Sequence, residues 1–315
     1  MTPKLPTASF NPKQYHELTF TDNFMFCKVM TKNLDLCRQL LEMILKVKIR
    51  KIVSADSEET LAVTPEGKSV RLDVYVEDEA DTIYDIEMQT SSQKNLPKRT
   101  RYYQGIIDLN LIGKGVDYSE LNKSFVIFIC TFDFFERGIP VYTFTNRCKE
   151  LLEVELGDDT AKVFINPYGE AEHLSDDMRA FLKYLRGEIT KGNGLIEAME
   201  QEVISARNCK EWRVEYMTLM MEYRERYHEG RKAGFDQGIA EGREQGIAEG
   251  KAEGIEQGIE QGIEQGVKAV IESCQELGAS YKKCLEQLML RFSVTEEKAG
   301  KYMNQYWVEP VSRQE

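Results

Sequence analysis

The stretch RLDVYVEDEADTIYDIEMQ, residues 71–89, decides the fold. In its first half Leu72, Val74 and Val76 alternate with more polar residues, which places these three on one side of an extended chain. The second half, TIYDIEMQ, alternates in the same way. Two short alternating runs joined by a few polar residues are typical of a β-hairpin. We therefore expect two antiparallel strands with several acidic side chains on one face.

The register of this hairpin determines which acidic residues meet. If Glu79–Asp81 form a three-residue loop, Asp78 pairs with Thr82. The ladder then places Asp73 directly opposite Glu87, and residues in such positions have Cβ atoms roughly 4.5–5.5 Å apart. A slip of one residue would put the two carboxylates on opposite faces of the sheet. The even register therefore predicts a close pair of carboxylates.

Two carboxylates at this distance repel each other unless a cation neutralises them. Carboxylate oxygens on a rigid sheet suit Mg²⁺, and Mn²⁺ is also possible. Gln89 lies on the same face as Glu87, so its amide can reach the same ion, a bound water or a substrate oxygen. The alternative is that Asp73 and Glu87 belong to a solvated outer face of the sheet.

The composition excludes several classes of protein. The chain has 315 residues and a formal net charge of −12, which by itself argues against a general nucleic-acid-binding protein. Its N-terminus lacks the apolar segment of a secretory signal, and no apolar run is long enough to span a membrane. The seven cysteines are scattered without a CxxC pair, and the three histidines lie far apart. We expect a cytoplasmic protein with no membrane span, no disulfide framework, no zinc site and no catalytic triad.

Basic residues cluster directly after the hairpin. Lys94, Lys98, Arg99 and Arg101 occur with no acidic residue between Met88 and Ile107. Such a cluster can contact phosphate groups, or it can form an ordinary solvated basic face. The sequence leaves both interpretations open.

The order of the expected elements indicates a mixed α/β domain. Helical periodicity runs from residue 21 to 46 with a break near Asn33, and Thr21 or Asp22 can cap its start. The further elements, in order, are a strand within 49–64, the hairpin, a helix at 97–112 with Pro97 in its first turn, a buried strand at 124–132, strands at VYTFTN and KVFIN, and helices from 175 to 227.

Five blocks of the sequence resemble a known family. They are DNFMF (22–26), RLDVYV (71–76), DIEMQ (85–89), RTRYYQGIIDLNLIGKGVDY (99–118) and SFVIFICTFDFF (124–135). An Asp, then Glu-Met-Gln at the end of the next strand, then a basic helix, resembles the PD-(D/E)XK nuclease fold. The five blocks together resemble the Rpn family of recombination-promoting nucleases, also described as PD-(D/E)XK nuclease family transposases. The resemblance covers about residues 15–190 and implies an αβββαβ mixed sheet flanked by helices, here with a C-terminal helical extension.

The resemblance also implies a function and a site. It implies a DNA endonuclease linked to mobile-element recombination, with Asp73 and Glu87 as ligands of Mg²⁺ or Mn²⁺. Gln89 stands where the fold normally has a lysine that orients the attacking water. A neutral amide cannot supply that positive charge, so the metal must carry more of the catalysis. Asp85 shares the active face and is expected beside the site, and Asp22 either completes the site or caps the first helix.

The helix after the hairpin supplies the candidate DNA contacts. Lys98, Arg99, Arg101 and Tyr103 lie in its first two turns. We expect Arg101 and Tyr103, taken together as one face of this helix, to contact a phosphate at or near the cut. The alternative for Tyr103 is ordinary core packing.

A glycine occurs at every fourth position from Gly230 to Gly266. The absence of proline and the abundance of glutamate favour a helix, although each interior glycine costs about 1 kcal/mol relative to alanine. Close approach of a second helix can offset that cost, so residues 230–267 predict homo-oligomerisation or a spacer. The alternative is an expanded repeat with marginal structure.

The chain is therefore expected to contain four parts. The expected parts are a nuclease-like domain at 1–190, a helical connector at 191–229, the glycine-repeat helix at 230–267 and a small helical region at 268–315.

Three functions are compatible with these patterns. The first is a metal-dependent endodeoxyribonuclease that hydrolyses phosphodiester bonds. The second is a catalytically weak or inactive relative that binds DNA or acts as a scaffold, assembling through the glycine repeat. The third is a metal-dependent enzyme acting on another phosphodiester, such as RNA.

Overall fold

The computed structural model describes residues 10–61 and 70–308. The described residues form two compact units, one up to Arg224 and the other from Glu225 onward. Each unit has a hydrophobic core of its own. The hairpin and the basic helix that follows it both lie in the first unit.

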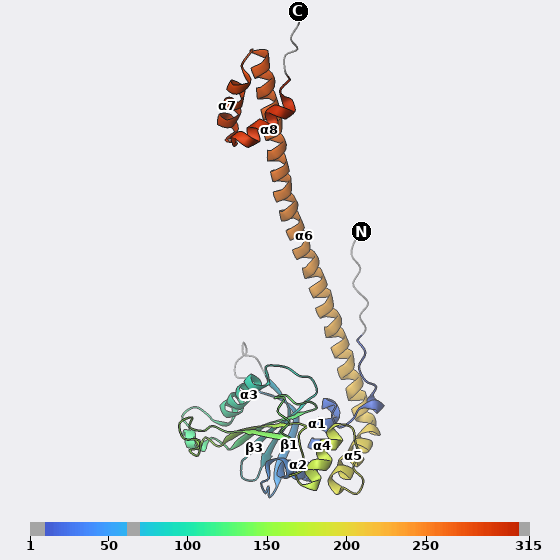
Figure 1. Cartoon of the computed structure of the whole chain (residues 1–315). Coiled ribbons are helices and arrows are strands. Elements are labelled where there is room, and N and C mark those ends of the chain that lie inside the picture. The colour runs from blue at the N-terminus through green and yellow to red at the C-terminus, as the bar shows by residue number, and fades with distance from the viewer. Residues whose placement is uncertain (1–9, 62–69, 309–315) are drawn as a thin grey trace, which may run out of the picture. The chain divides into compact units, whose positions relative to one another are not determined.

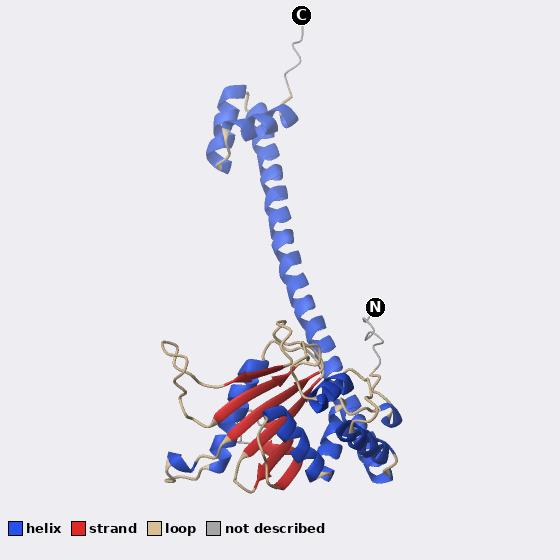
Figure 2. Ribbon diagram, turned by 60° about the horizontal axis from the view of Figure 1, so that its bottom comes forward, coloured by secondary structure: helices blue, strands red, loops and turns tan. Residues whose placement is uncertain are grey.

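A mixed sheet forms the centre of the first unit. Among the described residues its strands are Ile52–Leu61 (β1), Val70–Asp78 (β2), Ile83–Gln89 (β3), Ser124–Cys130 (β4), Val141–Phe144 (β5) and Thr160–Ile165 (β6). Their order is β1-β2-β3-β4-β6-β5, with β3, β4 and β6 parallel and the other neighbours antiparallel. Figure 2 shows helices in front of this sheet and behind it. The predicted PD-(D/E)XK-like α/β fold is confirmed. Part of the range predicted for the first strand, residues 62–64, lies outside the described residues.

Helices cover both faces of the sheet (Figure 1). They are α1 (Asn23–Lys32), α2 (Leu34–Leu45), α3 (Leu96–Leu111), α4 (Asp176–Leu185) and α5 (Gly194–Arg207), with short 3-10 helices at Tyr15–Glu17 and Tyr118–Glu120. The larger core cluster joins α1, α2, α4 and α5 to one face, and the smaller joins α3 to the other. All seven residues of β3 are consequently buried, including the acidic ones. The core extends past residue 190, because α5 contributes several fully buried side chains.

The break between α1 and α2 lies at Asn33, as the sequence predicts. The Asn33 side chain accepts a hydrogen bond from Leu36 N at 3.0 Å and so caps α2. The predicted cap of α1 is wrong. Asp22 precedes that helix, but its carboxylate accepts hydrogen bonds from Lys13 and Thr19 and from no backbone N–H of the helix.

The loop of the hairpin is the predicted one. Asp78 N donates to Thr82 O at 3.1 Å, and Glu79–Asp81 form the three-residue connection. Asp81 has a φ of 57°, a left-handed conformation that Asp tolerates better than most residues. The buried Asp78 carboxylate accepts from Ala80 N and Thr82 N, which fixes this turn. This turn thereby fixes the register of β2 against β3.

The antiparallel ladder of β2 and β3 confirms that register. Val74 pairs with Ile86, and the same alignment continued by one residue sets Asp73 against Glu87. There the backbone pairing stops, because Asp73 N donates to the Glu87 side chain instead of a strand carbonyl. The expectation that Leu72 shares a face with Val74 is wrong: Leu72 belongs to the cluster on the α3 side, and Val74 to the other. The departure from the ladder at Asp73 lies between them.

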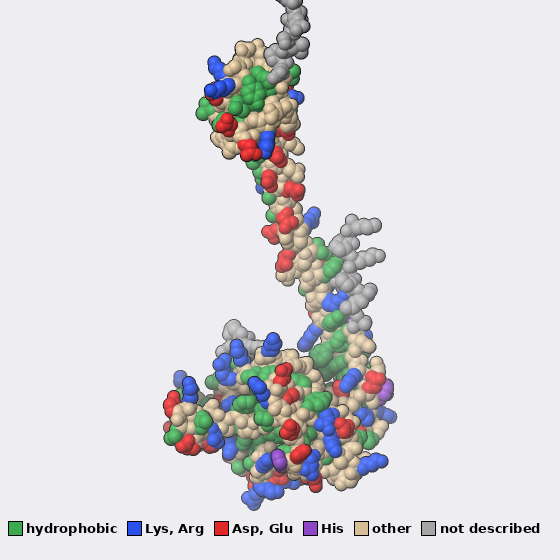
Figure 3. All heavy atoms as spheres, viewed as in Figure 1, with side chains coloured by type: hydrophobic (Ala, Val, Ile, Leu, Met, Phe, Trp, Pro, Cys, Tyr) green, Lys and Arg blue, Asp and Glu red, His purple; other side chains and the backbone are tan. Residues whose placement is uncertain are grey.

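The helix α6 spans Lys210–Glu276, and its part from Glu225 onward belongs to the second unit. The glycine repeat is helical throughout, as predicted. From Gly230 to Gly262 the space that a Cβ would take at each repeat glycine has no atom within 4 Å. Figure 3 shows acidic and hydrophobic side chains along the visible side of this part of α6.

Three helices close the second unit. They are the end of α6, α7 (Tyr281–Phe292) and α8 (Glu296–Tyr306). Val267, Ile271, Cys284 and Leu288 are fully buried between them. Thr295 caps α8 by accepting from a backbone N–H in its first turn.

Candidate functional site

Asp73 and Glu87 lie side by side where the backbone pairing between β2 and β3 ends. Asp73 N donates to Glu87 Oε1 at 3.0 Å, and Met88 N donates to Asp73 Oδ2 at 3.0 Å. Each carboxylate thus binds the backbone of the strand that carries the other. This exchange fixes both side chains more firmly than a simple cross-strand contact would. The structure therefore brings together the two residues that the hairpin register singles out.

The helix α1 adds residues that the sequence did not reveal. Asn23 Nδ2 donates to Asp73 Oδ1 at 2.7 Å. Cys27, one turn later, donates from Sγ to Asn23 Oδ1 at 2.9 Å and to Asp73 O at 3.2 Å. Asn23 lies within the DNFMF block, but no local pattern indicates that it reaches a strand 50 residues further along the chain.

Asp85 is the most deeply buried charge of the site. Its side chain has no exposed surface, and neither carboxylate oxygen has a hydrogen-bond partner among the described residues. Burial, followed by the charges of Glu87 and Asp73, raises the pKa of Asp85 well above its usual value. Asp85 was expected on the active face, and it lies there next to Glu87.

Glu87 titrates together with Asp85. Burial is the largest cause and the Asp73 charge the second, and together they raise the pKa of Glu87 to about 8. The Asp73 N–H and the Arg99 guanidinium act in the opposite direction. The two buried carboxyl groups therefore retain a proton at neutral pH unless additional positive charge enters the site.

Arg99, from the first turns of α3, supplies the positive charge of the site. Its guanidinium donates to Glu87 Oε2 at 3.0 Å, to Gln89 Oε1 at 2.9 Å and to Tyr103 OH at 2.8 Å. It also lies against the rings of Tyr103 and Phe128. Arg99 is thus held in one position by groups from α3, β3 and β4, and it is three-quarters buried.

Gln89 is oriented by two partners. Its Nε2 donates to Ser91 O at 2.6 Å, which leaves Oε1 to accept from Arg99. The Gln89 amide therefore binds the guanidinium of Arg99, a cation that comes from α3.

These residues lie within a region that matches a known family. Residues 23–240 match the family described as PD-(D/E)XK nuclease family transposase. The chain belongs to this family. Its matched part includes every residue of the site described above, from Asn23 to Tyr103. The comparison with curated proteins and the comparison with solved structures gave no match. Membership in this family makes a nuclease-like function the functional class of the chain.

The remaining candidate DNA contacts of this nuclease family member lie outside the carboxylate cluster. Lys98 and Arg101 are exposed on α3, whereas Tyr103 is buried and stacks on Phe128. The expectation that Arg101 and Tyr103 form one face is wrong, because residues two apart on a helix point about 200° apart. Arg99 and Tyr103, four apart, are the pair that meets. For Tyr103 the core-packing alternative holds, together with the hydrogen bond from Arg99.

The donor set is chemically suited to a hard divalent cation, as PD-(D/E)XK nucleases usually use. No group of three or more His, Cys, Asp or Glu among the described residues is arranged as a complete metal site. Mg²⁺, however, is commonly bound by one or two carboxylates together with waters. Asp73, Asp85 and Glu87 gather three carboxyl groups around one buried position, where Arg99 supplies only one positive charge and the raised pKa values of Asp85 and Glu87 indicate that more positive charge can be accommodated. The residues therefore fit a divalent cation.

Within the described ranges no helix is both long and apolar enough to cross a membrane. The longest one, α6, is charged along much of its length.

Proposed function

We propose that this protein is a metal-dependent endodeoxyribonuclease that hydrolyses phosphodiester bonds during mobile-element recombination in the cytoplasm. The observation that carries the proposal is the interlocked pair of Asp73 and Glu87, which places two carboxylates at one position on the rim of the sheet. The family supports the reaction class, and the three carboxyl groups gathered around one buried position support the need for a metal.

Asp73 and Glu87 are the proposed ligands of Mg²⁺, with Mn²⁺ as the substitute. When bound, such an ion lowers the pKa of a coordinated water and stabilises the charge that develops on the phosphate. Asn23 and Met88 N hold the Asp73 carboxylate in place through Oδ1 and Oδ2. Asp85, whose pKa burial raises well above its usual value, would release its proton only when the cation binds and would then add negative charge behind Glu87.

Arg99 is the proposed replacement for the missing lysine. Gln89 directs its carbonyl oxygen at Arg99, so the positive charge comes from α3 instead of β3. A guanidinium presents several N–H donors and matches phosphate oxygens geometrically. Arg99 can therefore stabilise the phosphate while Gln89 keeps it in position. Lys98 and Arg101, exposed on the same helix, are proposed to contact the DNA backbone on either side.

A second candidate follows from the ion pair between Arg99 and Glu87. This contact already neutralises part of the charge that a metal would neutralise. It favours, as the alternative, a catalytically weak or inactive relative that binds DNA and acts as a scaffold. In the endonuclease the carboxylates of Asp73 and Glu87 bind the metal, whereas in the scaffold they do not take part in catalysis. Variants of these two residues therefore separate the two candidates.

The test is nicking of supercoiled plasmid in Mg²⁺ and in EDTA, with DNA retention measured beside it. The endonuclease nicks only with the metal, and Asp73→Ala abolishes nicking without abolishing retention. Glu77→Gln, a change on the same strand outside the site, is the matched control and should nick like the wild type. Retention without nicking under any divalent ion would favour the scaffold. An RNA substrate at the same salt concentration tests the third function.

We also propose that α6 mediates self-association through residues 230–267. The repeat exposes Ile239, Ile247, Ile255 and Ile259 beside glycines whose Cβ space is open. A second copy could cover this apolar and glycine surface and offset the low helix propensity of the repeat. Sedimentation of the wild type beside a variant with Ile247 and Ile255 changed to Glu tests this, since the variant should be monomeric.

A further inference from the structure

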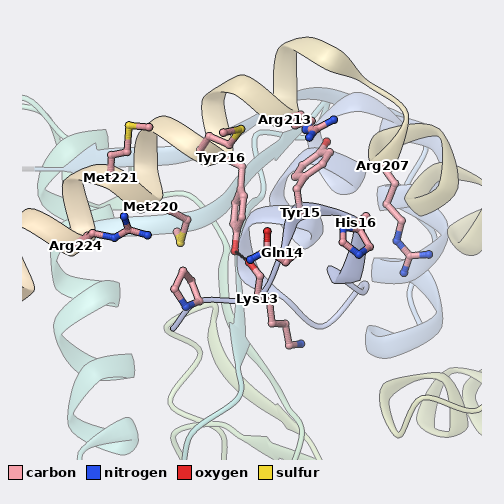
Figure 4. A pocket seen from close by; sticks show the side chains of 12 residues that line it. Lys13, Gln14, Tyr15, His16, Arg207, Arg213, Tyr216, Met220, Met221 and Arg224 are labelled. Atoms are coloured by element: carbon pink, nitrogen blue, oxygen red, sulfur yellow. Dashed lines mark hydrogen bonds between the residues drawn. The ribbon is translucent and has the colours of Figure 1, made fainter. Parts of the chain in front are cut away.

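A cavity of about 420 Å³ lies in the first unit, apart from the carboxylates, between an N-terminal segment and the first turns of α6 (Figure 4). Its lining residues are Pro12, Lys13, Gln14, Tyr15, His16, Arg207, Arg213, Tyr216, Met217, Met220, Met221 and Arg224. A volume of this size lies within the usual range of small-molecule sites, roughly 300–1,000 Å³.

The lining of this cavity is entirely free of acidic side chains. Four lining residues are Lys or Arg and one is His, in a chain whose net charge is −12. Two of these basic residues have acidic neighbours, since Asp22 pairs with Lys13 and Glu200 lies 3.9 Å from Arg207, whereas Glu215 pairs with Lys28 outside the cavity. The remaining positive charge of the lining is that of Arg213 and Arg224. A cavity of this charge, in a protein of the opposite overall charge, favours an anionic ligand.

Two of the arginines, Arg213 and Arg224, have no side-chain partner in the part of the chain that the structure describes. Among the described residues, the guanidinium groups of Arg213 and Arg224 have no hydrogen bond and no ion pair, whereas Arg207 Nε donates to Leu18 O. The helix offers them no partner, because the positions three and four residues before and after each carry no acid. Arg213 and Arg224 are therefore available to an external anion.

The centre of the cavity is aromatic and rigid. The hydroxyl of Tyr15 donates to Ala206 O at 2.6 Å, and that of Tyr216 donates to Lys13 O at 2.9 Å. Both rings are thereby fixed, and Met220 lies beside them. Figure 4 shows the two rings in the middle of the pocket, with Arg224 and Met220 on one side and Arg207 on the other. Figure 3 shows hydrophobic and basic side chains side by side where α6 begins.

We propose that this cavity binds nucleotides, with a base against Tyr216 and Met220 and with phosphates on Arg213 and Arg224, which lie about 16 Å apart along α6. Arginine forks match phosphate oxygens, and aromatic rings stack on bases without regard to sequence. A simple inorganic anion would use the arginines alone and would leave the aromatic and thioether wall uncovered. A DNA strand can place one phosphate on each arginine, whereas a free nucleotide uses one of them, and both share the chemistry of a base on an aromatic ring and a phosphate on a guanidinium.

Three consecutive residues connect the cavity to the carboxylate site. Asp22 pairs with Lys13 of the cavity, Asn23 donates to Asp73, and the ring of Phe24 lies 5.2 Å from that of Tyr216. A strand that occupies the cavity is thus bound next to the start of α1, which positions Asp73. The assignment of this nucleotide to the substrate strand rests on the proposed endonuclease function, but the binding itself does not.

The test is fluorescence anisotropy with a labelled, 5′-phosphorylated single-stranded oligonucleotide, in EDTA so that no cleavage occurs. Arg213→Ala/Arg224→Ala should bind at least about tenfold more weakly, because two charge-assisted phosphate contacts are lost. The slope of log K against log salt should fall by about 1.4, since each contact to a single strand contributes roughly 0.7. Arg226→Ala, on the same helix but outside the cavity, is the matched control and should bind like the wild type.

A second variant separates lost contacts from lost structure. Arg213→Lys/Arg224→Lys keeps both charges and should restore most of the affinity, whereas a misfolded protein would not be rescued. Equal binding by the wild type and the double alanine variant would overturn the proposal. So would a loss of equal size in Arg226→Ala, because it would indicate a general charge effect.

Competition distinguishes the two sources of nucleotide. Displacement of the oligonucleotide by deoxyadenosine monophosphate, lost in the double alanine variant, supports a pocket for a free nucleotide. Displacement by unlabelled oligonucleotide alone supports a strand-binding site. Displacement by inorganic phosphate as efficiently as by the nucleotide would overturn the role of the aromatic wall. Because Asp73→Ala should bind the oligonucleotide normally in EDTA, failure of the endonuclease proposal and failure of this one give different results.

Discussion

Arg99 lies 3.0 Å from Glu87 Oε2, and the same guanidinium reaches Gln89 Oε1 at 2.9 Å. Gln89, which the resemblance aligns with the lysine of this fold, therefore has a positive charge beside it that comes from the neighbouring helix α3. The arrangement explains how a chain with a neutral glutamine at this position can retain a charged site.

Replacement of Arg99 tests this arrangement. Arg99→Ala leaves the carboxyl groups of Glu87 and Asp85 without the guanidinium that lowers their pKa values, so we expect nicking to fall by about 10²–10³, as for loss of a preorganised charge donor. We also expect destabilisation of about 1–3 kcal/mol in urea unfolding, because buried acceptors lose their donor. Arg99→Lys keeps the positive charge but cannot reach both Glu87 and Gln89, so its nicking rate should lie between those of the wild type and Arg99→Ala. Full activity in Arg99→Ala would contradict the proposed role.

The buried pair of Asp85 and Glu87 should make stability depend on pH. The pKa of Glu87 is raised to about 8 in the folded protein, so the folded state holds more protons than the unfolded state between about pH 4.5 and pH 8. The stability that this proton provides is fully present below about pH 4.5 and is lost as the pH rises through about 8. Each unit of such a shift corresponds to about 1.4 kcal/mol.

Asp85→Asn isolates this effect. The change removes the deepest carboxyl group and relieves its repulsion with Glu87, so the free energy of unfolding should rise relative to the wild type at pH 8 and change less at pH 5. Urea titrations at the two pH values measure the difference. Parallel pH profiles for the two proteins would show that the pair does not titrate as described.

The hairpin is the part of the site that the sequence predicted best. The loop at Glu79–Asp81 and the position of Asp73 opposite Glu87 were both predicted. They follow from the alternation of apolar and polar residues along the two strands and from the short connection between them. These are local properties, and the pleat of a strand has a period of two that leaves little freedom. The fold class followed from the same stretch because the elements around it occur in a familiar order.

Contacts between distant elements could not be predicted in this way. Asn23 reaches Asp73 because α1 packs against β2, and Arg99 reaches Glu87 because of the rotation of α3 about its axis. Neither the packing position of a helix nor its rotation is encoded by local spacing. The nucleotide-binding cavity unites residues about 200 positions apart, such as Lys13 and Tyr216, and so had no signal in the sequence.

Asn23 offers a second test of the site. Asn23→Ala removes one hydrogen bond to Asp73 Oδ1, which should cost about 0.5–1.5 kcal/mol of stability and reduce nicking. Asn23→Asp places another acid against Asp73 and should be the more damaging change at neutral pH. Thermal unfolding and nicking rates of the two variants provide the comparison. A harmless Asn23→Asp would mean that this contact does not position Asp73.

The glycine repeat of α6 permits a test in which helix stability and association respond in opposite directions. Changing Gly238, Gly242, Gly246 and Gly250 to alanine meets open space in the single chain and should stabilise the helix by about 1 kcal/mol per site. If a second copy packs closely on these glycines, the same change should weaken self-association. Circular dichroism reports the first effect and sedimentation the second. Association that is unchanged or stronger in the alanine variant would exclude close packing at the glycines.

The most direct test of the central claim is a double-mutant comparison of nicking rates in Mg²⁺ with Asp73→Asn, Glu87→Gln and the two combined. If the two carboxylates hold one ion together, each single change should abolish the same function, and the double variant should be no worse than either single one. All three proteins should then fall to the same background rate while the wild type nicks the plasmid. Substantial nicking by either single variant, or losses that multiply in the double variant, would contradict a shared metal site.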